Sequence, residues 1–252
     1  MIYFPNNIFT QAIILNLPEQ RKKEIKLSSS SLLVKKIVDN NENVGLVPTT
    51  DLINHKELFV SNKFGISFEG ALCNNYIYFK QKENIVNELN LFGDVSSIEV
   101  IIGKILFKEM YNSDVKIKLI ADNFREANKN LIVIGDKNFE SESYKSGISL
   151  AEEIADLLTL PFVNYILVSN SEEKLKQVEG ELVSSAKNIY NTFGKIEPLK
   201  KYTEETRNYI LSNLSSLTFQ LEEQDLEGIQ NLLQLPYYHG VMDDMIEIKF
   251  LK

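Results

Sequence analysis

The sequence has one cysteine, two histidines and no long apolar run. A single cysteine cannot form an internal disulfide or a thiolate metal cage, and the strand-like segment around Cys73 predicts a buried thiol that acts as a small apolar residue. His55 is predicted to be exposed, and His239 to pack against or cap the last helix. No run approaches the roughly 18 apolar residues of a membrane-spanning helix. We therefore expect no metal site and no membrane contact.

Basic charge is also scarce. The 252 residues carry a net charge of -8, which argues against a nucleic-acid-binding surface because such a surface needs a basic face. The N-terminus lacks a basic start, and residues 5–7 interrupt its apolar stretch, so it does not have the pattern of a signal peptide and we expect a cytoplasmic protein. The sequence has no phosphate-binding loop and no nucleophile elbow, so we expect no cofactor.

Short β-rich runs alternate with amphipathic segments along most of the chain. Residues 96–111 carry apolar residues at helical spacing behind a Ser-x-x-Glu capping box, and 149–160 opens in the same way. After residue 169, apolar stripes at helical spacing predict helices. The pattern predicts an α/β fold with a helical C-terminal region. The expected strands cover residues 2–4, 44–47, 64–68, 75–80, 116–120, 131–134 and 162–168.

Two of these strands, 75–80 and 162–168, bracket the middle of the chain. If both cross between two halves, the protein has two lobes, a hinge and a cleft. We expect residues 1–78 and 166–252 to form lobe 1 and residues 79–165 to form lobe 2. The ligand is expected in the cleft between them.

Polar residues follow several strand-like runs, at the sheet edge where an α/β protein holds a small ligand. Each has an ordinary structural alternative: Thr49 can cap a short helix to about residue 55, and Glu69 can be a solvated turn acid. Partial desolvation would instead make Glu69 a general base. The candidates at these strand ends are Asn6, Asn7, Thr49, Thr50, Ser67, Glu69, Gly70 and Asp136.

Ser96 and Ser97 begin the strongest helix and are candidates for an anion site. Ser96 and Glu99 also form a complete capping box without any ligand. Glu99 would repel a nearby anion by about 1 kcal/mol or more. Capping and anion binding therefore both stay open for this helix start.

Five segments, in this order, resemble the chorismate dehydratase family of the futalosine pathway of menaquinone synthesis. Pro-Asn-Asn-Ile-Phe (5–9) is similar to the opening of the related dihydroxynaphthoate synthase. The resemblance implies a type 2 periplasmic-binding-protein fold, with two α/β lobes, a hinge and the ligand in the cleft. The five segments are Val-Gly-Leu-Val-Pro-Thr-Thr-Asp-Leu-Ile (44–53), Gly-Ile-Ser-Phe-Glu-Gly-Ala (65–71), Asp-Val-Ser-Ser (94–97), Leu-Ile-Val-Ile-Gly-Asp (131–136) and 152–162, which ends in Leu-Pro-Phe.

The resemblance implies a carbon-oxygen lyase that removes water from a cyclic dicarboxylate without a cofactor. Such a reaction needs an oriented substrate and a proton acceptor, and the implied catalytic residues are Asn6 and Glu69. The chain departs from the family at the helix start, where Ile98, Glu99 and Val100 replace an arginine and two hydroxyl residues. The implied substrate-binding residues are Asn7, Thr49, Thr50, Ser67, Gly70, Ser96, Ser97 and Asp136.

Three functions follow from these observations. The first is a chorismate dehydratase-like lyase, and the second is a non-catalytic cytoplasmic protein of the same fold that binds a small carboxylate. The third is the dihydroxynaphthoate synthase branch. In each the partner is a small carboxylate ligand, with no nucleic acid and no membrane, and the protein is expected to be a monomer or a homodimer.

Overall fold

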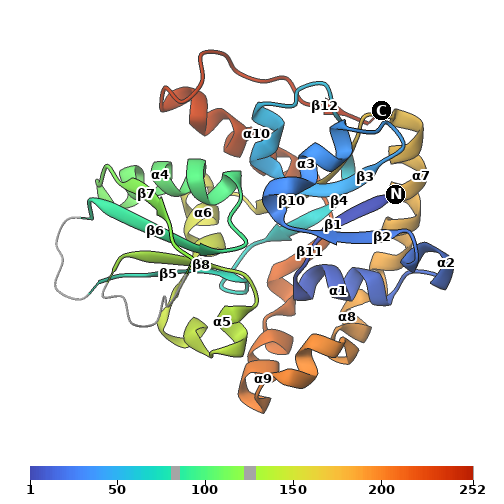
Figure 1. The fold of residues 1–252 in the computed structure, drawn as a ribbon, viewed down its shortest axis with the longest axis horizontal. Coiled ribbons are helices and arrows are strands. Elements are labelled where there is room, and N and C mark those ends of the chain that lie inside the picture. The colour runs from blue at the N-terminus through green and yellow to red at the C-terminus, as the bar shows by residue number, and fades with distance from the viewer. Residues whose placement is uncertain (81–85, 122–128, 252) are drawn as a thin grey trace.

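The computed structural model describes residues 1–80, 86–121 and 129–251, which form two β-sheets with helices around them (Figure 1). The first sheet has the order β11-β4-β10-β3-β1-β2, with β12 paired to β4, and the second has the order β7-β6-β8-β5-β9. The first comprises β1 (Ile2–Pro5), β2 (Ile25–Ser28), β3 (Val44–Pro48), β4 (Phe59–Phe68), β10 (Phe162–Ser169), β11 (Leu217–Gln220) and β12 (Lys249–Phe250). The second comprises β5 (Asn75–Tyr78), β6 (Glu88–Gly93), β7 (Lys116–Leu119), β8 (Leu131–Ile134) and β9 (Ile148–Ser149).

The chain passes between the sheets at two short connections. It leaves the first sheet after Phe68 and enters the second at Asn75, and it returns between Leu158 and Phe162. Residues 75–78 thus belong to the second sheet and 162–165 to the first, which corrects the expected boundaries at 78 and 165. The strands themselves are not the crossovers, because each pairs along its length within one sheet. We keep the names lobe 1 and lobe 2 for the parts built on the first and second sheets.

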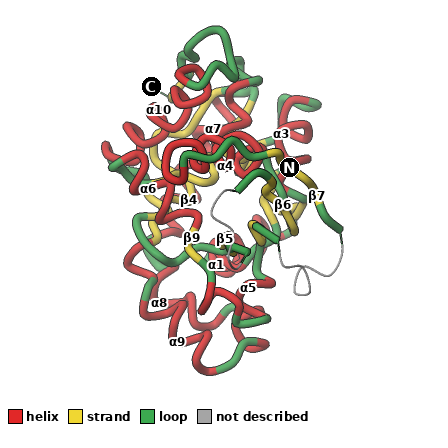
Figure 2. The backbone as a smooth tube through the Cα atoms, turned by 90° about the vertical axis from the view of Figure 1, so that its left-hand side faces the viewer, coloured by secondary structure: helices red, strands yellow, loops and turns green. Residues whose placement is uncertain are grey.

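Helices cover both sheets. In Figure 1 the second sheet lies on the left with α4, α5 and α6, and the first lies on the right with α1, α3 and α7. Figure 2 shows α8 and α9 at the lower end of the molecule and α10 at the upper end. The helices are α1 (Ile8–Leu15), α2 (Glu19–Lys22), α3 (Ser30–Val38), α4 (Ser97–Tyr111), α5 (Lys137–Glu140), α6 (Leu150–Leu158), α7 (Glu172–Ala186), α8 (Ile189–Thr192), α9 (Glu204–Ser212) and α10 (Glu223–Tyr238), with the 3-10 helix η1 (Thr49–Ile53). No helix in the described ranges is long and apolar enough to cross a membrane.

β10 is the central strand that holds lobe 1 together. It runs antiparallel to both β3 and β4, and all of its residues are buried. A strand that is buried on both faces has a largely apolar sequence. This is why the sequence of residues 162–168 predicted a strand. Fully buried aromatic side chains such as Phe68 and Phe162 pack within the same apolar core.

Several local expectations are confirmed. α4 begins behind a capping box formed by Ser96 and Glu99, Ser149 caps α6, and Cys73 is buried, which raises the pKa of its thiol. The prediction that Thr49 caps a short helix is wrong, because Thr49 is the first residue of η1 and its hydroxyl donates to the Val163 carbonyl of β10 at 2.7 Å. Most of the segment between β7 and β8, residues 122–128, lies outside the described residues.

Candidate functional site

Asp94 joins the two lobes at the start of α3. It follows β6 in lobe 2, and its carboxylate accepts hydrogen bonds from Ser30 N at 2.9 and 3.2 Å and from Ser30 Oγ at 2.6 Å. Ser29, at the N-cap position of α3, makes no capping bond with its side chain. Asp94 therefore satisfies the helix N-terminus from the opposite lobe, where the helix dipole also favours a negative charge.

Asp51 makes a similar contact in the opposite direction. It lies in η1 of lobe 1 and accepts a hydrogen bond of 2.5 Å from Ser97 Oγ, at the first residue of α4 in lobe 2. Ser97 Oγ also lies 2.6 Å from Thr50 Oγ1. Burial raises the pKa of Asp51 despite the Ser97 bond, and its Oδ2 is buried without a hydrogen-bond partner among the described residues.

Asp136 makes the third contact in which an acid of one lobe approaches the start of a helix in the other lobe. It follows β8 in lobe 2 and approaches the backbone N–H of Ile8, the first residue of α1 in lobe 1. Burial raises the pKa of Asp136 to about 7, although the Asn74 side chain and the Ile8 N–H act in the opposite direction. The residue as a whole keeps partial exposure, but its Oδ1 is buried and accepts no hydrogen bond from the described residues.

Glu99 is a fourth acid at this junction. Its side chain is 1% exposed and accepts hydrogen bonds from Asn75 Nδ2, Ser96 N and Ser96 Oγ, each at 2.8 Å. Burial raises the pKa of Glu99, which means that the site favours its protonated form. Tyr165 lies beside it: burial and then the Glu99 charge raise the pKa of the Tyr165 phenol well above its ordinary value, and its hydroxyl lies 2.7 Å from Ser30 Oγ.

We call Asp51, Asp94, Glu99 and Asp136 the interlobe acids. Within the described ranges, no lysine or arginine forms an ion pair with any of them. The starts of α1, α3 and α4 therefore each face a carboxylate that the protein itself supplies from the opposite lobe. The same three starts are where the anion of a small ligand would be held. A second anion must displace one of these carboxylates and will be repelled by the others.

The structure brings together only part of the predicted site. Thr50, Ser96, Ser97 and Asp136 lie at this junction, and Asn7 is the N-cap of α1 beside Asp136, where its Oδ1 accepts from Thr10 N at 3.0 Å. Asn6 is exposed next to it.

The remaining predicted residues lie elsewhere. Ser67 is fully buried in β4, and its hydroxyl has no partner among the described residues. Glu69 is exposed, and its backbone N–H donates to the Ser216 carbonyl at 2.9 Å. Gly70 also packs against Ser216, and Glu69 lines a hollow of about 210 Å³ with residues of β11 and α10. These residues are not joined by any hydrogen bond to the interlobe acids.

Sequence reasoning missed Asp51, Asp94, Ser30 and Tyr165. The signal for Asp94 was present, because Leu89, Leu91 and Phe92 mark a strand that ends in Gly-Asp, and residues 89–92 are all buried. β6 was not recognised, so its polar end was not counted as a strand end. Ser30 had no such signal, since its partner is 64 residues away in the chain.

Comparisons with known proteins identify the fold. No family model matches the chain, and no curated protein matches it. Among solved structures, protein AF1704 from Archaeoglobus fulgidus has a TM-score of 0.69 at 11% identity, over 96% of this chain and 97% of that one. The alkanesulfonate-binding protein SsuA from Xanthomonas axonopodis, bound to MOPS, has a TM-score of 0.60 at 14% identity over 99% and 94%.

The periplasmic aliphatic sulphonate binding protein SsuA from Escherichia coli has a TM-score of 0.58 at 11% identity, over 98% of this chain and 89% of that one. At these identities the likeness concerns the fold alone. The neighbours cover almost the whole chain, including both sheets and the connections between them. The chain therefore has the two-lobed α/β fold of the type 2 periplasmic-binding proteins.

Proposed function

We propose that this chain is a small-ligand-binding protein that closes its two lobes around an organic anion bearing one carboxylate or sulfonate. The observation that carries the proposal is the reciprocal set of contacts between carboxylates and helix starts. Ser30 already binds the Asp94 carboxylate through its N–H and its hydroxyl, at 2.6 to 3.2 Å. A ligand carboxylate or sulfonate can take the same donors, because they suit any anionic oxygen.

The interlobe acids set the charge of this ligand. At a separation of about 4 Å, two like charges repel each other by roughly 1 kcal/mol in water and roughly 4 kcal/mol at an effective dielectric constant of 20. A dianion would meet this repulsion at both of its charged groups. A monoanion can replace one carboxylate at one helix start and place an uncharged body near the others. We therefore propose a monoanion and not a dicarboxylate.

A second candidate is a dehydratase-like lyase acting on a cyclic carboxylate, as the order of the five sequence segments implies. The observation that favours it is Asp136, since burial raises its pKa to about 7. A general base works best when its pKa lies near the operating pH. In this alternative Asp136, rather than the exposed Glu69, accepts the substrate proton, and the amide of the neighbouring Asn7 orients the substrate.

The binding proposal is tested by removing the Asp94 carboxylate, which competes with a ligand for the Ser30 donors. Asp94→Ala leaves the Ser30 N–H and hydroxyl free and removes a nearby negative charge. We expect benzoate and methanesulfonate to bind this variant about tenfold more tightly than the wild type, since a charge-assisted hydrogen bond contributes about 1.5 kcal/mol or more. Isothermal titration calorimetry measures the two dissociation constants. Asp114→Ala, which removes an exposed acid paired with Lys108, should leave them unchanged.

Two results would reject these candidates. If neither anion binds the wild type or Asp94→Ala, the start of α3 is not a ligand site and the binding proposal fails. The lyase is tested separately by incubating the wild type with chorismate and searching for enolpyruvyl benzoate by mass spectrometry. Absence of this product removes the dehydratase, and product formation that persists in Asp136→Asn removes Asp136 as its base.

A further inference from the structure

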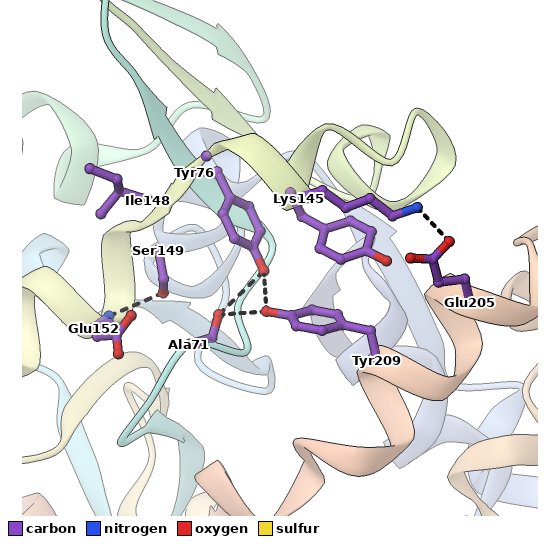
Figure 3. Close-up of a pocket in the computed structure, with 10 residues that line it drawn as sticks. Ala71, Tyr76, Lys145, Ile148, Ser149, Glu152, Glu205 and Tyr209 are labelled. Atoms are coloured by element: carbon purple, nitrogen blue, oxygen red, sulfur yellow. Dashed lines mark hydrogen bonds and ion pairs between the residues drawn. The ribbon is translucent and has the colours of Figure 1, made fainter.

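A second cavity lies between lobe 2 and α9, and the interlobe acids do not line it. Its volume is about 560 Å³, within the usual range for small-molecule sites. Figure 3 shows its walls: Tyr76, Ser149 and Glu152 come from lobe 2, Tyr209 comes from α9, and the Ala71 carbonyl comes from the connection between the lobes. Nothing in the proposed function uses this cavity.

Aromatic rings form one side of the cavity. Tyr144 and Tyr209 are stacked with their centroids 4.4 Å apart and their planes at 24°, and Tyr76 lies 6.4 Å from Tyr144. The two stacked rings come from different lobes, so they form one wall only when the lobes are together. The faces of such rings attract cations and apolar groups.

Three oxygen atoms at the inner end of the cavity form a triangle that can only accept further hydrogen bonds. The Tyr76 and Tyr209 hydroxyls lie 3.1 Å apart, and they lie 3.3 and 3.2 Å from the Ala71 carbonyl oxygen (Figure 3). The two phenols supply two hydrogens, and the triangle itself uses both. Burial raises the pKa of each phenol, so both stay protonated at neutral pH. A ligand that reaches the triangle must bring its own donors.

The charged groups around the cavity favour a cation. Lys145 is held by Glu142 at 3.0 Å and by Glu205 at 2.7 Å, so its charge is compensated. The exposed Glu152 lines the same cavity, and its carboxylate forms no ion pair with any residue that the structure describes. Burial is the main cause that raises the pKa of Tyr209, and the Glu152 charge acts in the same direction. An anion would meet Glu152 and would find no free donor at the triangle.

From these contacts we infer that the cavity binds a primary ammonium ion carried on an aromatic or apolar body. The ammonium donates to the oxygen triangle and pairs with Glu152, while its body lies against the stacked rings of Tyr144 and Tyr209. Each part of the ligand matches one observed property of the cavity. These properties are the three acceptor oxygens, a carboxylate with no ion pair among the described residues, and the aromatic wall. This site is distinct from the junction at the interlobe acids.

Calorimetric titration with 2-phenylethylamine tests the inference. We expect one saturable site per chain, and binding at least tenfold weaker for phenylacetate, which has a similar body and the opposite charge. The N,N,N-trimethyl derivative keeps the charge but has no N–H, so it should also bind more weakly, by about fivefold. If 2-phenylethylamine shows no saturable binding, or if phenylacetate binds equally well, the inference is overturned.

Variants locate the site. Tyr209→Phe keeps the ring and removes one acceptor, and we expect it to raise the dissociation constant for 2-phenylethylamine about fivefold. Glu152→Gln removes the charge, and we expect it to raise the same constant about threefold. Glu227→Gln, which removes an exposed acid on α10, should leave it unchanged. Equal dissociation constants for Glu152→Gln and Glu227→Gln would place the amine elsewhere and refute the assignment.

Discussion

Replacing Asp136 with asparagine should change how the free energy of unfolding depends on pH. Burial raises the pKa of Asp136 to about 7 from an ordinary value of 3.8. As the pH rises, the carboxyl group therefore ionises in the unfolded chain before it ionises in the folded protein. Between about pH 4 and pH 7 the folded state binds more protons than the unfolded state, so stability falls as the pH rises. The amide that replaces the carboxyl group in the variant does not titrate.

The size of the effect follows from the shift. One pKa unit corresponds to about 1.4 kcal/mol, so Asp136 lowers the stability of the wild type by up to about 4 kcal/mol between pH 4 and pH 7.5. Burial also raises the pKa values of Asp51 and Glu99, so these groups also lower the stability of the folded protein as the pH rises. Both are present in the variant, so the difference between wild type and variant isolates Asp136.

Urea unfolding at pH 4.5, 5.5, 6.5 and 7.5 measures this difference. We expect Asp136→Asn to gain stability relative to the wild type at each step upward in pH. Asp114→Asn, which removes an exposed aspartate, serves as the control and should follow the wild type. Parallel curves for the wild type and Asp136→Asn would refute the reasoning, since they would mean that the carboxyl group is not held in a buried site.

Two further substitutions test individual positions in the strands β4 and β6. Ser67→Ala removes a buried hydroxyl that has no partner among the described residues, so we expect chemical denaturation to show a gain of about 1 kcal/mol. Gly93→Ala should lose about 3 kcal/mol or more in the same assay, because Gly93 has φ +110° and an added Cβ would lie 1.9 Å from the Ile134 carbonyl oxygen.

Each of these substitutions has a matched control. Ser61→Ala should destabilise the protein by about 2 kcal/mol, since the buried Ser61 hydroxyl donates to Glu179 at 2.6 Å. Gly103→Ala places a Cβ no closer than 3.7 Å to its neighbours inside α4, so it should be neutral or stabilising. A loss of stability in Ser67→Ala, or equal changes of stability in Gly93→Ala and Gly103→Ala, would contradict this packing.

The sequence was sufficient for the elements whose causes are local. The capping box at Ser96 and Glu99 and the continuous apolar run of β10 predicted α4 and a buried strand, because backbone hydrogen bonding and burial act within a few residues. The alternation of such strands with helices was enough for the two-lobed α/β fold. The strands β2 and β6 were missed, since each has polar residues within its apolar pattern.

The junction between the lobes could not be read in the same way. The bond between Asp94 and Ser30 links residues 64 positions apart, and that between Ser97 and Asp51 links residues 46 apart. Such contacts depend on the order of strands in the sheets and on how the two lobes pack together. The spacing of residues in a single sequence does not predict either of these. Local reasoning assigned Glu99 to capping and to the repulsion of an anion, but it could not predict that Asn75 of β5 donates to the same carboxylate.

The position of β10 has a consequence for biosynthesis. β3 and β4 emerge from the ribosome early, yet the strand that belongs between them is made only after the whole of lobe 2. At translation rates of roughly 5–20 residues per second, the two early strands wait on the order of 5–20 s with their inner edges unpaired. Nascent chains stalled within lobe 2 should therefore recruit chaperones, and release should follow once residue 169 has cleared the exit tunnel.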